Sequence, residues 1–322
     1  MSFNPNVSWG RAKMDASHIL ASLAPTAKLF LVGSSSVARR YIIDQVFKND
    51  QEGYNRIFTT IDDAINACTA SAGDVILVMP GHTETISSAT ALNLDVAGIS
   101  IVGLGVGSLR PTITLDTATT TTIPVSAANI TVKNMIFTAN FADIVSVFTL
   151  TTAKNLNLDG NYFKATATDM NFLYIVDTNT TTSDCDGLTI VNNKWIEPDT
   201  ATLSMVKMDG TNYDINIKNN FLQLGVNNNK ASLVAIITGK VIGNSQILDN
   251  MVYRLNTDSA TGALLVTTDG STNTGIIARN FVQHADTAAE LLVTASSGFG
   301  VFSNYASGVA GASGYLLPGA DS

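Results

Sequence analysis

The stretch Leu188-Thr-Ile-Val-Asn-Asn193-Lys-Trp195 decides the fold, because nearly the same phrase occurs seven times in this chain. Each copy has alternating apolar residues, then an Asn, then an aromatic or aliphatic pair. The marker asparagines are spaced by 27, 32, 27, 30, 30 and 24 residues, and they are Asn134, Asn161, Asn193, Asn220, Asn250, Asn280 and Asn304. A repeat of about 20–50 residues is typical of proteins built from stacked units.

The repeat has the chemistry of β-strands. Apolar side chains alternate within each phrase, so one face of the segment points inward and the other outward. A second apolar run lies about midway between successive phrases, at residues 145–150, 172–176, 203–208, 233–238, 263–267 and 291–294. We therefore predict an all-β fold, a right-handed parallel β-helix of about nine coils, each about 4.8 Å from the next.

The repeated Asn has a structural interpretation. Its backbone tolerates the left-handed conformation and its amide bonds locally, which suits a bend between two strands. Amides stacked one above another can also bond to each other along the axis of the coil. The stacked residues are expected to be Asn193, Asn220 and Asn280 at one bend, and Ile190, Ile217 and Ile276 in one continuous core.

The sequence divides into three parts. Residues 57–295 are predicted to form the β-helix, with a short amphipathic helix over 58–68, N-capped by Thr60, laid across its open end. Residues 1–56 depart from the repeat and are predicted to be an anchor segment, with a strand-like run at 28–32 and a helical pattern at 37–47. Residues 296–322, rich in Gly, Ala and Ser, are predicted to be a closing coil and tail.

Charge is unevenly distributed between these parts. Residues 1–56 carry seven basic and four acidic residues, net +3, and the remainder carries 11 and 22, net −11, which together give −8. An acidic rod repels nucleic acid, so no nucleic-acid partner is expected. The basic surplus either has no meaning or meets an acidic protein surface, in which case the candidate contacts are Arg11, Lys13, Arg39 and Arg40.

Cysteines and targeting signals indicate assembly in the cytoplasm. Cys68 and Cys185 are too few for a disulfide framework, and both are expected to be free and buried. There is no basic-plus-apolar signal at Met1 and no apolar run of about 18 residues, so neither secretion by the common route nor membrane insertion is expected.

One acidic row is the best candidate for chemistry. Asp177, Asp209 and Asp269 each follow the second apolar run of their coil. Asp177 and Asp209 are expected to lie one coil apart, about 5 Å, which is compatible with a paired-carboxylate hydrolase. Asp-Gly is also an ordinary turn dipeptide, and we favour that reading.

No other chemistry is expected. The three histidines are scattered, and metal ligands at usable spacing are absent. The glycine-rich Gly103-Leu-Gly105-Val-Gly107 is followed by Pro111 and a strand, whereas a phosphate site needs a helix N-terminus. We therefore predict no catalytic, cofactor-binding or metal-binding residues.

Several segments between residues 28 and 115 resemble a group of tailed-bacteriophage virion proteins, β-helix proteins that decorate the head. The similar segments are Lys28-Leu-Phe-Leu-Val-Gly33, Arg56-Ile-Phe-Thr-Thr-Ile-Asp-Asp-Ala-Ile65, Gly73-Asp-Val-Ile-Leu-Val-Met-Pro-Gly81 and Gly103-Leu-Gly105. The resemblance implies a non-enzymatic capsid decoration protein on the virion surface, with the major capsid protein as partner. By analogy with other β-helical rods and with the three-fold positions of head lattices, we expect a homotrimer.

Two other classes stay open. One is a tail fibre or tailspike that binds host surface glycans, with or without hydrolase activity, and the other is a free glycan-active enzyme. The segment 73–81 is also similar to the first coil of pectin-degrading β-helices. Their catalytic acids and Arg have no counterpart here, which favours shared architecture without shared activity.

Overall fold

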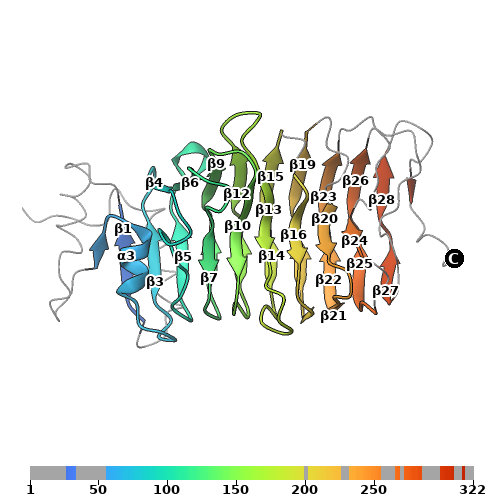
Figure 1. The fold of residues 1–322 in the computed structure, drawn as a ribbon, viewed down its shortest axis with the longest axis horizontal. Helices are drawn as coiled ribbons and strands as arrows, with labels where there is room; N and C mark the ends of the chain where they lie inside the picture. Colours follow the sequence, from blue (N-terminus) through green and yellow to red (C-terminus); the bar gives the residue numbers. More distant parts are fainter. Residues whose placement is uncertain are drawn as a thin grey trace, which may run out of the picture.

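The computed structural model describes residues 27–33, 56–198, 202–225, 232–254, 265–268, 272–284, 298–307 and 314–315, and within them the chain is a parallel β-solenoid (Figure 1). Sheet A contains, in spatial order, β2 (Ile57–Phe58), β1 (Leu29–Val32), β3 (Val75–Val78), β5 (Ser100–Gly103), β8 (Thr131–Lys133), β11 (Asn157–Asp159), β14 (Thr189–Val191), β18 (Asn216–Lys218), β22 (Ser245–Leu248), β25 (Gly275–Ala278) and β27 (Phe299–Phe302).

Two more long sheets complete each coil. Sheet B contains β4 (Thr83–Ile86), β6 (Thr112–Leu115), β9 (Ile136–Ala139), β12 (Tyr162–Ala165), β15 (Lys194–Glu197), β19 (Phe221–Leu224), β23 (Met251–Arg254), β26 (Phe281–His284), β28 (Tyr305–Ser307) and β29 (Gly314–Tyr315). Sheet C contains β7 (Ile123–Val125), β10 (Ile144–Leu150), β13 (Phe172–Asp177), β16 (Ser204–Met208), β20 (Ser232–Ile236) and β24 (Val266–Thr267), and a fourth, small sheet pairs β17 (Asn212–Tyr213) with β21 (Ile242–Gly243).

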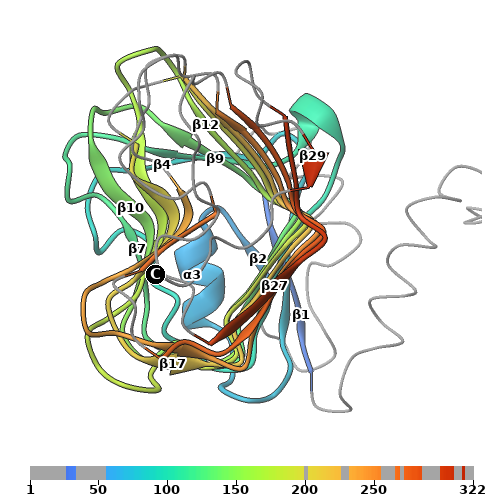
Figure 2. The ribbon, with the colours of Figure 1, turned by 90° about the vertical axis from the view of Figure 1, so that its right-hand side faces the viewer.

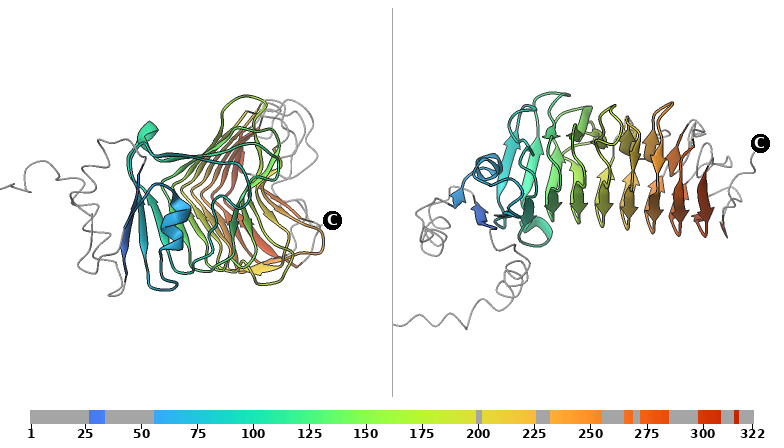
Figure 3. Two further views of the ribbon diagram at one scale, coloured as in Figure 1. Left: turned by 60° about the vertical axis from the view of Figure 1, so that its left-hand side comes forward. Right: turned by 90° about the horizontal axis from the view of Figure 1, so that it is seen from below.

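The sheets are stacked coil on coil. Among the described residues, all strand pairs are parallel except β28 with β29. The nine sheet A strands from β3 to β27 bound eight full turns. In Figure 2 the C-terminal end faces the viewer, and the chain runs anticlockwise from sheet A through sheet B to sheet C as it advances. That is the right-handed sense which parallel crossovers adopt. Figure 3 shows the same stack from two further sides.

The core is built from rows of apolar side chains that occupy equivalent positions in successive coils. One inward row of sheet A runs, in register, through Val132, Leu158, Ile190, Ile217, Ile247 and Ile277. Each of these residues is buried, and burying such a side chain contributes about 1.5–3 kcal/mol. The prediction for Ile190 and Ile217 is therefore confirmed.

The prediction for Ile276 is wrong. Its side chain is 41% exposed on the outer face of β25, and Ile277 takes the inward position instead. Successive strand residues point to opposite faces, so a shift of one residue moves the side chain from the core to solvent.

The second apolar runs form sheet C, as the periodicity predicts. Five of them lie in β10, β13, β16, β20 and β24. The sixth, at 291–294, lies outside the described residues.

The helix α3 (Ile61–Asn66) lies at the N-terminal end of the solenoid (Figures 1 and 2). Thr60 caps it as predicted, because its Oγ1 accepts a hydrogen bond from the N–H of Asp63 at 3.2 Å. Ile61, Ala64 and Ile65 are buried in the same apolar cluster as the first coils.

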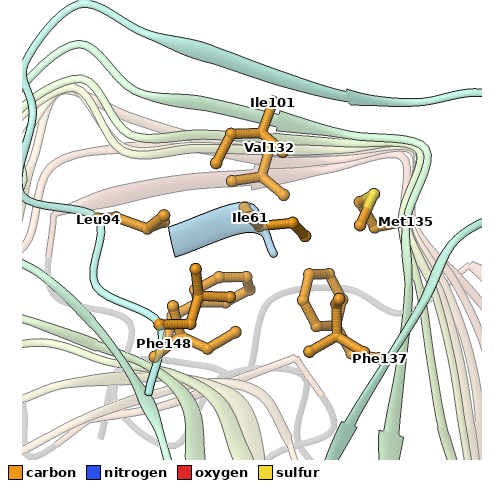
Figure 4. Close-up of a pocket in the computed structure, with 10 residues that line it drawn as sticks. Ile61, Leu94, Ile101, Val132, Met135, Phe137 and Phe148 are labelled. Carbon is orange, nitrogen blue, oxygen red and sulfur yellow. The ribbon is translucent and has the colours of Figure 1, made fainter. Parts of the chain in front are cut away.

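A small apolar cavity lies between Ile61 of α3 and side chains of the next coils. Ile61 faces it from the helix, with Leu94, Ile101 and Phe148 among the opposing side chains (Figure 4). The cavity volume is about 10 Å³, enough for about one water molecule. Because its wall is apolar, a water would find no hydrogen-bond partner there, so the cavity is packing space rather than a ligand site.

The predicted anchor segment contributes a strand to the rod. The strand-like run at 28–32 becomes β1, which pairs in register with β3 on one side and with β2 on the other. The 3-10 helix η1 (Gly107–Leu109) is the other short helical element described. The helical pattern at 37–47 lies outside the described residues.

The two cysteines differ from the prediction in one respect. Both are free, but only Cys185 is buried, whereas Cys68 is partly exposed at the end of α3. Within the described residues, no helix is long and apolar enough to cross a membrane.

Candidate functional site

The most extensive polar feature is a ladder of buried asparagines at the bend between sheets A and B. It consists of Asn161, Asn193, Asn220, Asn250, Asn280 and Asn304, each at most 1% exposed. The Oδ1 of each accepts the backbone N–H of the equivalent residue one coil earlier, at 2.8–3.0 Å. Each Nδ2 donates to a sheet A carbonyl of that earlier coil, at 2.8–2.9 Å. The predicted stacking of Asn193, Asn220 and Asn280 is confirmed.

The bend itself is made by the residue before each ladder position. Gly160, Asn192, Asn219 and Arg279 have φ of 66, 58, 53 and 55°, in the left-handed region. The bend therefore divides two tasks that the sequence interpretation assigned to one Asn: the preceding residue turns the backbone, and the ladder Asn satisfies the buried N–H and C=O groups that the turn leaves.

Asn134 is a correction to the predicted repeat. It occupies the turn position, with φ of 57°, and Met135 occupies the ladder position. The Nδ2 of Asn134 reaches outward to the carbonyls of Gly103 and Gly105, at 2.7 and 3.1 Å. The ladder thus begins at Asn161.

Arg110 takes over at the end of the ladder. It follows η1, and its guanidinium donates to the carbonyls of Asn134, Met135 and Gly160, at the bends of two successive coils. Burial lowers the pKa of Arg110 from its ordinary value, although a guanidinium stays protonated in proteins. The sequence does not predict this role, because the carbonyl of Asn134 lies 24 residues after Arg110 and no sequence pattern links the two.

The candidate carboxylates Asp177 and Asp209 are brought close together, but with a lysine between them. The Nζ of Lys207 lies 2.7 Å from Asp209 Oδ2 and 3.3 Å from Asp177 Oδ1. The same ammonium lies 5.6 Å from the ring centre of Tyr174, within the range of a cation–π contact. The site is therefore an ion-paired cluster on sheet C.

The electrostatics of this cluster favour a charged lysine. Burial raises the pKa of Asp177, and the charge of Lys207 offsets this only in part. Burial lowers the pKa of Lys207, but its hydrogen bond to Asp209 and the charges of both carboxylates outweigh burial and raise it above the ordinary value. All three groups are partly buried, so these interactions are less screened than on an open surface.

Asp177 and Asp209 lie one coil apart, as expected, but they are not directly opposite each other. Asp177 pairs in register with Lys207, so the offset in sheet C is 30 residues, whereas in sheet A the same two coils are offset by 32, as in Asn157 and Thr189. Two extra residues lie between sheets B and C in the earlier coil, and they shift Asp209 past its expected partner.

The other predicted site residues cannot be placed. Asp269 and the candidate capsid contacts Arg11, Lys13, Arg39 and Arg40 lie outside the described residues. Within the described residues, no group of three or more His, Cys, Asp and Glu side chains is arranged to hold a metal ion.

His82 has a partner that the sequence interpretation did not assign. It is buried, and its Nε2 lies 3.2 Å from Glu84 Oε2. The same carboxylate oxygen accepts the N–H of Ile61, the first residue of α3, at 3.1 Å. Residues two apart in an extended segment point to the same face, so the pair could have been recognised in His82-Thr-Glu84.

Two further carboxylates tie neighbouring coils on the surface. Burial raises the pKa of Asp159, but hydrogen bonds from Asn192 and Lys133, at 2.9 and 2.7 Å, outweigh burial and bring it below the ordinary value. Arg279 donates two hydrogen bonds of 2.7 Å to Asp249, and these lower the pKa of that carboxyl. Both contacts join consecutive coils at the same corner as the ladder.

The fold has a structural neighbour among solved proteins. No family model and no curated protein matches this chain. Among solved structures, the chain is similar to ORF18 of Geobacillus virus E2, with 12% sequence identity and a TM-score of 0.40. The match covers 95% of this chain and 66% of that protein, so the chain spans about two thirds of its neighbour's length.

Proposed function

We propose that this chain is a structural virion protein, a non-enzymatic rod that decorates and stabilises the exterior of a bacteriophage capsid. The observation that carries the proposal is how the polar side chains are used. The ladder, Arg110 and the surface ion pairs all join one coil to the next. Buried polar networks of this kind rigidify a fold, which suits a load-carrying rod. The resemblance of residues 28–115 to head decoration proteins supports the same role.

The carboxylate cluster favours a structural role over hydrolysis. A retaining or inverting glycosidase needs one carboxyl that donates a proton and another that acts as nucleophile or base. Here the ammonium of Lys207 contacts both carboxylates. That ammonium occupies the space between the two carboxylates, where a glycosidic oxygen would have to lie.

We further propose that residues 1–56 attach the rod to the major capsid protein, and that three copies assemble as a homotrimer. The pairing of β1 with β3 fixes the start of the rod to this segment, so a surface bound by residues 1–26 would hold the whole solenoid at its N-terminal end. In that arrangement α3 closes the same end, since its buried face covers the first coils.

Purified particles provide the test. Quantitative mass spectrometry should find this protein at a copy number comparable to that of the major capsid protein, and immunogold labelling should place it on heads. Labelling confined to tails, at a small fraction of that copy number, would overturn the decoration role and favour the tail fibre or tailspike. Loss of host polysaccharide on incubation with wild-type protein, but not with Asp209→Asn, would overturn the non-enzymatic role.

Deletion defines the attachment segment. Removal of residues 1–26 retains β1, and the truncated protein should stay folded but no longer bind empty heads. A longer deletion through residue 50 would remove β1 from between β2 and β3 and expose the edge of sheet A. A companion variant, Arg39→Glu/Arg40→Glu, keeps the full chain and should weaken head binding. Full occupancy by both variants would place the docking surface elsewhere on the rod.

A further inference from the structure

The outer face of sheet B carries a continuous row of large side chains along the rod. The residue after each ladder asparagine faces outward, and these residues pair in register from coil to coil. We call this set the aromatic row, and it consists of Tyr162, Lys194, Phe221, Met251, Phe281 and Tyr305. At about 4.8 Å per coil, the row is about 24 Å long.

The row is packed along its length rather than scattered. The Nζ of Lys194 lies 5.4 Å from the ring centre of Tyr162 and 5.5 Å from that of Phe221, between the two rings. The rings of Phe281 and Tyr305 are stacked, with centres 5.4 Å apart and planes 12° apart. Tyr253, in the neighbouring outward row, contacts Phe221 and Phe281.

The row leaves apolar surface open to solvent. Met251 is 37% exposed and Tyr305 is 40% exposed. From β12 to β28, the two described outward rows of sheet B hold no Asp or Glu. Enrichment in Tyr, Phe and Met with depletion of carboxylates is the composition of a protein–protein interface core, and apolar patches of this kind mark interaction sites.

The charge of the row indicates what covers it. Lys164 and Lys194 give these two outward rows a charge of +2, in a chain whose net charge is −8, so the remaining residues carry −10. A cationic, apolar face on an otherwise acidic molecule is complementary to the surface of a second copy of that molecule.

The ring geometry disfavours a glycan as the occupant. A sugar packs on the open face of an aromatic ring. In this row the faces of Phe281 and Tyr305 are turned to each other, and the facing sides of Tyr162 and Phe221 are occupied by Lys194. Met251 and the exposed part of Tyr305 are left for a partner, and such surface suits packing against protein side chains.

We propose that the aromatic row is the self-association surface of this protein, and that it packs against a carboxylate-bearing face of a neighbouring copy whose rod runs parallel. Parallel rods repeat every coil, so contacts made at one coil recur at the next. If the row packed against the same row of a parallel neighbour, Lys194 would lie near Lys194. A contact between the row of one copy and a different face of the next copy avoids this, and around a three-fold axis such contacts close a ring. The three-fold closure rests on the homotrimer of the proposed function, but the identity of the surface does not.

Solution assembly of the full chain tests the proposal. Sedimentation equilibrium of the wild type should show an oligomer at micromolar concentration. Met251→Glu/Tyr305→Glu should weaken assembly at least about tenfold, because two negative charges would face the carboxylates of the neighbouring copy. The matched control, Val106→Glu/Tyr213→Glu, changes two exposed apolar residues away from sheet B, at 80% and 43% exposure, and should assemble as the wild type does.

A second measurement needs no substitution. When unlabelled and 15N-labelled chains are mixed and treated with a carbodiimide, Lys194 or Lys164 should be joined to an Asp or Glu of a differently labelled chain. A monomeric wild type, assembly unaffected by the row variants, equal disruption by the control, or cross-links that never involve the row would each overturn the proposal. So would a monomer whose binding to host glycans is lost in the row variants. These results do not depend on particle location, so a tail-located protein could still assemble through this row.

Discussion

The contribution of the asparagine ladder can be measured at Asn220, in the middle of the stack. Its amide makes four hydrogen bonds. Oδ1 accepts from the backbone N–H of Asn193 at 3.0 Å and from the Asn193 side chain at 3.1 Å. Nδ2 donates to the carbonyl of Ile190 at 2.8 Å and to Asn250 Oδ1 at 3.0 Å.

Asn220→Ala removes all four bonds, but not all the former partners lose their only contact. The Asn193 side chain still donates to Leu158, and Asn250 Oδ1 still accepts the N–H of residue 220. The backbone N–H of Asn193 and one acceptor site of Ile190 remain buried without this partner. At about 1–3 kcal/mol for each buried group left unsatisfied, the expected loss of unfolding free energy is about 2–6 kcal/mol.

Denaturant unfolding followed by circular dichroism measures the global change, and amide hydrogen exchange measures it locally. The N–H of Asn193 should lose protection more than amides of distant coils do. Asn66→Ala is the control, since its amide bonds only to Asp62 on the exposed surface of α3 and should change stability by less than about 0.5 kcal/mol. If Asn220→Ala also stays within that limit, or if Asn193 keeps its protection, the ladder does not stabilise the fold as argued.

Three other outcomes are expected. Ile217→Asp buries an unpaired charge and should cost several kcal/mol or prevent folding, whereas Ile276→Asp, on the exposed side of its strand, should unfold at nearly the wild-type denaturant concentration; equal effects would contradict the assigned faces. Burial raises the pKa of Cys68 to about 12 and that of Cys185 to about 11, so neither thiol should react with a thiol reagent at pH 8 until the protein unfolds, and fast labelling of the native protein would refute this. The pKa of Asp159 is below its ordinary 3.8 in the folded state, so its ionised carboxylate stabilises the fold above about pH 4 and this stabilisation is lost as the pH falls through the folded pKa. The stabilisation should be under about 1 kcal/mol. Asp159→Asn should make the unfolding free energy fall less steeply with decreasing pH, and an unchanged pH dependence would contradict this.

The repeat was readable because the bend needs an amide at a fixed place. Asparagine can satisfy both the N–H and the C=O that the turn exposes, so Asn recurs in the sequence once in each coil. The inward-facing residue of each coil lies three positions before the ladder asparagine, as Ile217 does before Asn220. Applied to Asn280, the same count selects Ile277 rather than its neighbour Ile276.

The carboxylate cluster was not readable for the opposite reason. Its register depends on the length of the connection between sheets B and C, which changes from coil to coil and has no periodic marker. Asp177 lies 16 residues after its ladder Asn161, and its partner Lys207 lies 14 residues after Asn193. Only the three-dimensional pairing shows that a lysine separates the two acids.

The aromatic row carried a signal that the repeat itself obscured. Each member directly follows a ladder asparagine, so it was counted as part of the repeated phrase. Alternation assigns this position to the outer face, where an aromatic side chain is not required by the core and therefore needs a different explanation.

The ladder also gives the rod a direction under force. Each ladder amide satisfies a backbone N–H of the coil before it, so a coil is complete only when the next one has been laid down, in the order in which a ribosome delivers them. Pulling on the C-terminal end would then remove coils singly, each departure breaking one rung and opening one backbone N–H of the new terminal coil to solvent. With the 30-residue spacing between Asn220 and Asn250 and about 3.3–3.6 Å per extended residue, each step would release about 100 Å of chain. Strain applied at the far end of such a rod would unwind one coil at a time before it reached the end that carries α3.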